Sequence, residues 1–472
     1  MPRFRQKINT TIVFFLILSL LPVPLGAGRA SAFSVGEEKE VGEKLLSMVR
    51  KSFQVIDDPD ISQYVNDIGQ RILTVAGPQY FDYHFFVINN NEFNAFAAPS
   101  GLVFIHSGLI EAMDSEGELI SVMAHECGHV TSRHISDRLQ KSTKTSLGMA
   151  ALLIAGIAMG GGALSQALIT GSMAANASMN LKFSREDEEE ADRLSFKWMQ
   201  ALEVDPADME KMLEKMYRVS VYRSANIPAY LLTHPEPKQR SGYVQDLISN
   251  AQPTKTYRPV DNFSFLRMKQ RILAITKDPA TLRAQFLRKA NQDSDPKSIM
   301  AQYGLALIAQ AGADYAKAEE LMQKVIQAYP DRVILKTDLA NILTQSGRQK
   351  EALALLNAAH AADPNCAYTT YTLAQNLEQT GEHQKALTLF EDLLPVIPDH
   401  AMLHHSIGNL EIRLGKKGVG HYYLGCYFWM EGDAKNARYH LDETLKDSSV
   451  DQPTQAKAKT LLADIERIEK DK

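Results

Sequence analysis

The sequence predicts a mostly α-helical protein in two unlike parts, and three observations lead to this prediction. A chain of 472 residues exceeds one ordinary core, because a domain typically holds about 100–200 residues. The first half carries a His-Glu-Cys-Gly-His pattern inside a segment with helical periodicity. The second half repeats small and large apolar residues every 34 positions, which is typical of an α-solenoid built from helix pairs.

Composition and charge exclude several classes of protein. Hydrophobic residues make up 45% and charged residues 23%, which indicates a globular chain rather than a disordered or many-span membrane protein. The three cysteines, Cys127, Cys366 and Cys426, form neither a disulfide framework nor a CxxC metal motif, and whether Cys366 and Cys426 pair is open. A net charge of −5 without a basic stripe argues against nucleic acid as a partner.

Residues 1–32 are predicted to be an export signal. Three basic residues precede an apolar run over residues 11–21, and Ala30-Ser31-Ala32 is a pattern that signal peptidase cuts after. The apolar run is shorter than the roughly 20 residues that a spanning helix needs. Cleavage after Ala32 removes four of the 51 basic residues and none of the 56 acidic ones, so the exported chain has a net charge of −9.

The segment 115–130 is predicted to be a helix that opens with a capping box and carries a metal motif. His125 and His129 lie one turn apart on one face, so both imidazoles can reach one zinc ion, and Glu126 flanks them as a proton acceptor. The alternative is a pair of surface histidines at helical spacing. Cys127 points away from this face and is interpreted as a small buried hydrophobe.

A third ligand decides between these interpretations. Position 135, where a metzincin carries its third His, is Ile135. His134 lies about 140° around the helix from the second His, which favours a surface or supporting place over a ligand role. Downstream, the segment 183–192 opens a second helical pattern in which Glu188 and Asp192 share one face. The alternative for this acidic run is a solvated helix start, favoured by the helix dipole.

HExxH followed by ExxAD resembles the gluzincin branch of metallopeptidases that contains the HtpX heat-shock peptidases and the CAAX prenyl proteases. The resemblance implies a peptidase domain of helices plus a small sheet, with Glu188 as the third zinc ligand and Asp192 as an acid that orients the ligands. One Zn²⁺ per chain on His125, His129 and Glu188 keeps its fourth position for water, and Glu126 accepts the proton during peptide hydrolysis.

Residues 94–97 and 99–101 resemble the NAF…PGG strand of the same family, with Ser100 where Gly is usual. The apolar strand that follows, if it is an exposed sheet edge, holds an extended substrate by main-chain hydrogen bonds with little sequence preference. The residues expected there to contact substrate are Asn94, Gly101, Leu102 and Val103.

His234 and Arg240 lie in a segment that resembles the HPxxxxR element of the family. Arg240 is expected to contact substrate. Three interpretations of His234 remain open: it stabilises the oxyanion, as the resemblance implies; it caps the open position of the zinc and holds the enzyme inactive; or it satisfies a buried hydrogen bond.

The segment 145–181 has 37 residues without Asp, Glu, Lys, Arg or His, and it contains six glycines. A single membrane crossing is excluded, because it would place Glu188 across the bilayer from the two histidines. A membrane-inserted hairpin, an apolar flap over the cleft or on a membrane or partner, and buried core helices are the alternatives.

Residues 299–434 are predicted to form four tetratricopeptide-type repeats, preceded by a helical bridge over 256–298 and followed by capping helices over 435–472. Small residues let the paired helices approach, and a proline ends each of the first three units. These small residues are Ala306, Ala340, Ala374 and Gly408 in one series and Ala318, Ala352, Ala386 and Gly420 in the other. The concave surface is expected to bind a peptide or protein; a spacer without ligand is the alternative. Candidates to line it are Tyr368, Tyr371, His404 and His405.

An export signal, a peptidase domain over 33–255 and a repeat arm, in this order, resemble a periplasmic class of the family that serves outer-membrane protein assembly. The resemblance implies an endopeptidase for unfolded or misassembled envelope proteins, which the repeats recruit to the assembly machinery. The alternative is a chaperone or adaptor whose zinc site is mostly capped. The segment 145–181 is expected to allow peripheral contact with a membrane. A membrane-embedded prenyl-protein protease is disfavoured by the export signal and by the lack of several spans.

Overall fold

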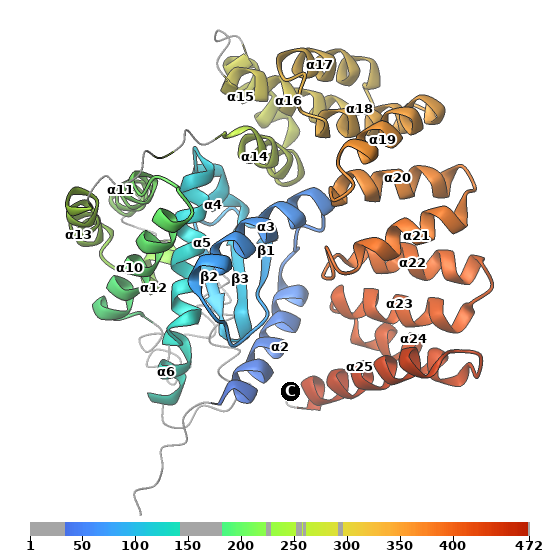
Figure 1. Ribbon diagram of the computed structural model, residues 1–472, viewed down its shortest axis with the longest axis horizontal. Coiled ribbons are helices and arrows are strands. Elements are labelled where there is room, and N and C mark those ends of the chain that lie inside the picture. Colours follow the sequence, from blue (N-terminus) through green and yellow to red (C-terminus); the bar gives the residue numbers. More distant parts are fainter. Residues whose placement is uncertain are drawn as a thin grey trace, which may run out of the picture.

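A computed structural model describes residues 34–141, 182–222, 228–251, 257, 261–290 and 296–470. It confirms the mostly helical fold class, with one three-stranded sheet in the amino-terminal half and helix pairs in the carboxyl-terminal half. Figure 1 shows the amino-terminal half on the left and the repeat arm running down the right side. The predicted export signal and the insert 145–181 lie outside the described residues.

The amino-terminal half packs its helices around a small sheet. Its described elements are α2 (Val35–Ser52), α3 (Pro59–Ala76), β1 (His84–Ile88), β2 (Ala95–Ala98), η1 (Pro99–Gly101), β3 (Leu102–His106), α4 (Ser107–Ala112), α5 (Glu116–Thr131), α6 (His134–Lys141), α10 (Arg185–Ala201), α11 (Ala207–Tyr222), α12 (Ala229–Thr233) and α13 (Pro237–Asn250). Within the described ranges, no helix is both long and apolar enough to cross a membrane.

The sheet has the strand order β1-β3-β2, with β1 parallel and β2 antiparallel to β3. One stack of three aromatic rings runs across it: Phe104 lies between Phe86 at 5.2 Å and Phe96 at 4.8 Å, measured between ring centroids. Because buried aromatic stacks add to the burial of apolar area, this row fixes the register of the three strands.

The expectation that residues 101–105 form an exposed sheet edge is wrong, because β3 is the central strand and is hydrogen-bonded on both sides. The main chain of Leu102 and Val103 is therefore not free to pair with an extended substrate. The outer position belongs to β2. Ser100, at a family glycine position, has φ 69°, a left-handed conformation that glycine adopts without the steric cost of a side chain.

Helix α5 begins at Glu116, directly after its predicted N-cap Ser115. Ser115 Oγ accepts a hydrogen bond from Glu118 N at 3.2 Å. The predicted capping box is only half formed, since Glu118 accepts instead from Asp114 N and forms an ion pair with Lys215. The helix start is thus tied to α11, which carries Lys215.

The repeat arm consists of antiparallel helix pairs at the predicted period, which follow two bridging helices. The elements are α14 (Phe263–Thr276), α15 (Pro279–Ala290), α16 (Pro296–Ala311), α17 (Tyr315–Ala328), α18 (Ile334–Gln345), α19 (Gln349–Ala362), α20 (Ala367–Gln379), α21 (His383–Leu393), α22 (Ala401–Arg413), α23 (Lys417–Met430), α24 (Ala434–Lys446) and α25 (Gln452–Lys470). The small-residue series is buried where paired helices cross. A Cβ added at Gly420 would lie 2.6 Å from Gly408 O, so this crossing requires glycine.

A buried ionic cluster, which we call the joint, fastens the arm to the amino-terminal half. Arg267 of the bridging helix α14 makes a bidentate pair with Asp338 of α18, at 2.9 Å for both contacts, and a further pair with Asp60 of α3 at 2.5 Å. Arg271 reaches Asp58, the N-cap of α3, at 2.6 Å. The joint consists of Asp58, Asp60, Arg267, Arg271 and Asp338.

The prediction that Tyr368 and Tyr371 line an open concave surface is wrong. Tyr368 donates a hydrogen bond to Asp338 and lies under the Arg271 guanidinium, 4.4 Å from the ring centroid. Tyr371 packs against Phe390 within the arm, and α20 lies on α3. The amino-terminal half therefore covers this part of the arm.

Further contacts continue toward the end of the arm. Asp399 in the loop before α22 bonds His84 Nδ1 of β1 at 2.6 Å and pairs with Arg50 at 3.3 Å. At the end of the arm, α25 returns to α2, as Figure 1 shows, and Arg467 pairs there with Glu43. His404 is also engaged, because its Nε2 bonds the Pro398 carbonyl. All three cysteines are buried free thiols.

Candidate metal centre

The close approach of α5 and α10 places the metal motif opposite the acidic motif. A Cβ on Gly128 would lie 3.1 Å from Ala191 Cα, so the glycine of HExxH and the alanine of ExxAD form the helix contact. Ser195 Oγ of α10, four residues after Ala191, donates to the carbonyl of Ser121 of α5, seven residues before Gly128, at 3.0 Å. Small residues at this crossing bring the side chain of Glu188 within reach of the two motif histidines.

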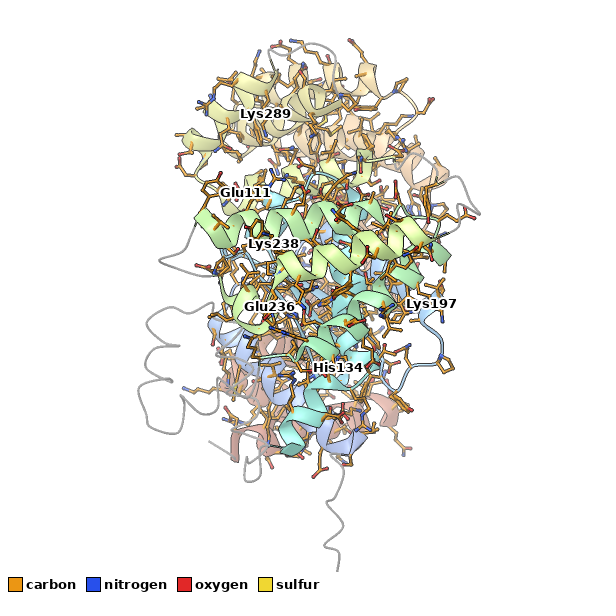
Figure 2. The ribbon with its side chains drawn as sticks, turned by 90° about the vertical axis from the view of Figure 1, so that its left-hand side faces the viewer. Glu111, His134, Lys197, Glu236, Lys238 and Lys289 are labelled. Carbon is orange, nitrogen blue, oxygen red and sulfur yellow. The ribbon has the colours of Figure 1, made fainter. Side chains whose placement is uncertain are left out.

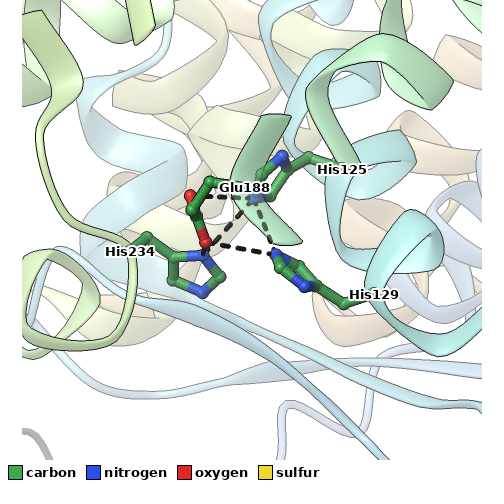
Figure 3. Close-up of side chains that lie close together, drawn as sticks. All are labelled: His125, His129, Glu188 and His234. Carbon is green, nitrogen blue, oxygen red and sulfur yellow. Dashed lines mark hydrogen bonds and ion pairs between the residues drawn. The ribbon is translucent and has the colours of Figure 1, made fainter. Parts of the chain in front are cut away.

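Four side chains converge where α5, α10 and the segment after α12 meet. One ligand atom from each of His125, His129, Glu188 and His234 lies within 4.8 Å of the other three (Figure 3). The Nε2 atoms of His125 and His129 are 3.1 Å apart, and Glu188 Oε1 lies 3.4 Å from His129 Nε2 and 2.9 Å from His234 Nδ1. All four are at least 98% buried. We call them the donor cluster.

Glu126 lies beside the donor cluster, between it and the sheet. Its Oε2 accepts a hydrogen bond from Ala97 N of β2 at 3.0 Å. Its Oε1 has no hydrogen-bond partner among the described residues and is 3.6 Å from His234 Nε2. A buried carboxylate oxygen without a donor is costly, and this one is placed to receive a proton.

A second layer of side chains supports the donor cluster. Asp192 Oδ1 contacts His125 Nδ1 at 2.8 Å, and Asp192 is itself held by Arg240 through two hydrogen bonds and by Tyr243. Arg240 also reaches Glu188 Oε2 at 2.6 Å. The Arg240 side chain is thus buried against the two carboxylates, and its expected contact with substrate stays a prediction.

Sequence reasoning missed two aromatic neighbours of the centre. The ring of Phe183 stacks on His129 with the centroids 3.8 Å apart, and the ring of Tyr230 stacks on His234 at 4.3 Å. His134, which the sequence placed either at the surface or in a supporting position, has its Nδ1 2.9 Å from His129 Nδ1, in agreement with the supporting position. The only sequence signal for Phe183 and Tyr230 is their nearness to motif residues, at five positions before Glu188 and four before His234.

The predicted substrate residues lie close to β2 and β3 rather than on an open surface. Asn94 directly precedes β2 and is fully buried, and its carbonyl accepts a hydrogen bond from His106 N. Gly101, Leu102 and Val103 are buried at the start of β3. Cys127 is fully buried, and burial raises the pKa of its thiol, so the interpretation as a small hydrophobe holds.

Electrostatics keep the carboxylates of Asp192 and Glu188 ionised. Burial favours the neutral form of Asp192, but Arg240 and His125 outweigh it and hold its pKa below the usual range. The pKa of Glu188 is likewise lowered, because Arg240 and His234 outweigh its burial. The pKa of His129 is lowered chiefly by burial, which favours the neutral imidazole that a metal binds.

The charges and donors fit a divalent cation. With neutral imidazoles, the three carboxylates of Glu126, Glu188 and Asp192 face one guanidinium, that of Arg240, which leaves two uncompensated negative charges in a fully buried space. Imidazole and carboxylate are the donors found in catalytic sites of this kind. The unpartnered Glu126 Oε1 at the same place agrees with a position reserved for a further polar group.

Fold and site together define a metallopeptidase with an HExxH helix and a carboxyl-terminal repeat arm. A family model described as peptidase family M48 matches residues 59–247, and a tetratricopeptide repeat model matches residues 307–368 and 343–410. The chain belongs to peptidase family M48.

Several known proteins are similar to this chain. The beta-barrel assembly-enhancing protease of Escherichia coli (strain K12) is 30% identical over 371 residues, which cover 71% of this chain and 75% of that protein. The protein of the same name from Yersinia pestis is 29% identical over 347 residues, or 72% and 70% of the two chains. Metalloprotease LoiP of Escherichia coli is 29% identical over 160 residues, covering 34% of this chain and 60% of that protein.

Proposed function

We propose that this protein is a zinc-dependent endopeptidase of the bacterial periplasm that cleaves misfolded or misassembled envelope proteins. One observation carries the proposal: the donor cluster of three imidazoles and a carboxylate lies directly beside the unpartnered oxygen of Glu126. The similarity to proteases named for β-barrel assembly supports substrates or partners in that process. The repeat arm recruits the substrate or the outer-membrane assembly machinery.

His125, His129 and Glu188 hold the zinc ion, and Asp192 orients His125. When bound, the zinc polarises the scissile carbonyl and makes the attacking water more acidic. Glu126 Oε1 takes the proton of that water and then delivers it to the leaving amine, because it is the oxygen left without a donor. The Ala97 N–H holds the other oxygen and so orients the carboxylate for both transfers.

Substrate binds as an extended strand beside β2, which replaces β3 as the edge available for pairing. Ala97 N points away from β3 toward Glu126, so the outer edge of β2 runs past the donor cluster. Pairing through the main chain suits unfolded segments of varied sequence. Asn94 orients this strand at its start.

His234 occupies the position that the reaction needs to be open. Its Nδ1 lies 2.9 Å from Glu188 and 3.3 Å from His125 Nε2, so it is placed as a fourth donor. This placement favours the cap interpretation over the oxyanion interpretation, since a group at fourth-ligand distance competes with water. It also favours a second candidate function: a chaperone or adaptor for outer-membrane protein assembly in which proteolysis is secondary.

Cleavage of a reduced, alkylated and therefore unfolded test protein distinguishes the two functions. Under the endopeptidase proposal the wild type or His234→Ala cleaves it, and Glu126→Gln abolishes cleavage while partner binding persists. Glu214→Gln, at an exposed position of α11, is the control and retains activity. If neither the wild type nor His234→Ala cleaves under saturating zinc, the endopeptidase proposal is wrong and the adaptor function is favoured.

Periplasmic location rests on the export signal, and peripheral membrane contact is proposed through 145–181. Mass spectrometry of the protein recovered from the periplasm is expected to give Phe33 as the first residue. Recovery of the full-length chain from the cytoplasm would contradict this location. Flotation with lipid vesicles tests the membrane contact, with a variant lacking 145–181 as the control.

A further inference from the structure

The two histidines of the metal motif expose their Nε2 atoms to the donor cluster and turn their Nδ1 atoms outward. The Nε2 atoms of His125 and His129 face each other at 3.1 Å, so these are the ligand atoms. A neutral imidazole that binds a metal through Nε2 carries its proton on Nδ1, and that proton needs an acceptor. For His125 the acceptor is Asp192, at 2.8 Å.

For His129 the acceptor is a second histidine. His129 Nδ1 lies 2.9 Å from His134 Nδ1, and the rings cross edge to face with centroids 5.1 Å apart. Two nitrogens at this distance share one proton. Because the proton belongs to His129, Nδ1 of His134 is the acceptor, and His134 carries its own proton on Nε2.

That proton is directed at a carboxylate. His134 Nε2 lies 3.5 Å from Glu190 Oε2, and Ser132 Oγ holds the other oxygen of Glu190 at 2.7 Å. Glu190 is on α10, two residues after Glu188. The acidic run of that helix therefore supplies both a proposed metal ligand and the last acceptor in this series of hydrogen bonds. The hydrogen bonds thus run from His129 through His134 to Glu190.

A break in the helix makes this contact possible. On an uninterrupted helix, residue 134 would lie about 140° away from residue 129. Here α5 ends at Thr131, Arg133 adopts φ 55°, and His134 begins α6, which turns its ring back toward His129. Arg133 is held in this conformation by the buried carboxylate of Glu38. Figure 2 shows His134 on the face of the molecule where α6 begins.

We propose that His134 is a positioning residue: by accepting the Nδ1 proton of His129, it fixes the tautomer and ring orientation in which Nε2 of His129 binds the metal. The proposal rests on the metal site proposed above. It predicts that His134 contributes to metal affinity through one acceptor atom at its δ position, and that its charge and size are secondary. Losing such a supporting partner typically weakens metal binding about 10–100-fold.

Two amide variants separate the acceptor role from packing. In His134→Asn the amide oxygen can occupy the place of Nδ1, whereas in His134→Gln it reaches the place of Nε2. We expect His134→Asn to bind Zn²⁺ within about threefold of the wild type and His134→Gln about 10–100-fold more weakly, measured by competition with a coloured chelator. Asp137→Asn, on the exposed side of the same helix, is the control and binds as the wild type does.

The visible spectrum of the Co²⁺-loaded protein provides a second readout, because it reports the ligand geometry and not the activity. It is expected to be the same for the wild type and His134→Asn and altered for His134→Gln. Equal affinity and equal spectra for the two amide variants overturn the positioning role. Failure of the wild type to bind metal instead overturns the metal site itself.

The melting temperature of the metal-free variants excludes a general folding defect as the cause. If His134→Gln does not fold, Glu190→Ala tests the outer end of the same chain at an exposed residue. We expect it to weaken Zn²⁺ binding about threefold, since the contact is long and partly exposed. In that case, unchanged Zn²⁺ affinity in a folded Glu190→Ala variant overturns the proposal.

Discussion

Two buried clusters of charged side chains, the metal centre and the joint, differ in how completely they are satisfied. The joint sets two guanidinium groups against three carboxylates, and Asp338 receives hydrogen bonds from both arginines and from Tyr368. The metal centre sets one guanidinium against three carboxylates, and Glu126 Oε1 has no hydrogen-bond partner in the described part of the chain. The joint is the less buried of the two clusters, since the side chains of Asp58 and Asp60 are 15% and 14% exposed, and the balance of charge also differs.

The difference shows how buried charge serves two purposes. A buried ionic cluster with matched partners holds two elements in one orientation, although its net contribution to stability is small. A buried cluster with excess negative charge is unfavourable until a cation enters. We therefore interpret the joint as a structural connection between the halves, and the metal centre as a site whose charge is balanced when a cation binds.

The largest effect, on metal binding, is expected from removing a ligand of the metal centre. Glu188→Ala removes one of three predicted ligands, and with binding free energies of about 10–16 kcal/mol for a full protein ligand set, its share corresponds to at least a 100-fold loss of affinity. Metal analysis should find well under one zinc ion per chain. Glu186→Ala, at an exposed position of the same helix, is the control. Wild-type metal content in Glu188→Ala would refute the ligand assignment.

At the joint, the expected loss is of stability rather than of metal binding. Asp338→Ala leaves Arg267 and Arg271 buried without their shared partner, which should lower the free energy of unfolding by about 3–5 kcal/mol in urea denaturation. Zinc affinity of the folded variant should stay at the wild-type value. Asp331→Ala, at an exposed position before α18, should change stability by about 0.5 kcal/mol or less. Equal effects of the two variants would argue against the joint.

A smaller effect is expected from opening the metal centre. If His234 caps the fourth position for most of the time, His234→Ala should raise kcat/KM for an unfolded substrate by about three- to tenfold, because it removes the cost of opening. A fall in kcat with little change in KM would support the oxyanion interpretation instead. Unchanged kinetics would leave His234 with a structural role.

The smallest effect is expected at the exposed rim of the contact between the halves. The hydrogen bond to Asp399 and its charge raise the pKa of His84 above the ordinary 6.5, while burial and Arg50 oppose the shift. Because the folded-state pKa is the higher one, this contact stabilises fully below about pH 6.5 and loses its effect as the pH rises through the folded-state value. Both side chains are about one third exposed, so the contribution is under about 1 kcal/mol.

Comparing the melting temperatures of His84→Gln and the wild type checks this sign. The variant should melt lower by a degree or two near pH 5.5 and at the same temperature near pH 9. A difference that grows with rising pH would contradict the assignment. His360→Gln, in the repeat arm away from this contact, controls for the general effect of removing an imidazole.

Much of the fold and of the candidate site follows from local patterns. The i, i+4 spacing of His125 and His129 needs only the geometry of one helix, and the 34-residue period needs only the repetition of one helix pair. Arrangements that depend on distant elements were predicted less well. The central place of β3 depends on β1 and β2 pairing on either side of it. The turn of Arg240 toward Asp192 depends on where α13 packs.

The sequence by itself determined which residues could bind a metal and that a helical repeat arm follows them, because both are written in short spacings along single helices. Only the tertiary structure decided that Glu188 meets the two histidines, through the contact of Gly128 with Ala191. It also decided that His134 lies against His129, through the left-handed turn at Arg133, and that the amino-terminal half covers part of the arm. Such contacts depend on the packing of elements far apart in the chain, which no local period encodes.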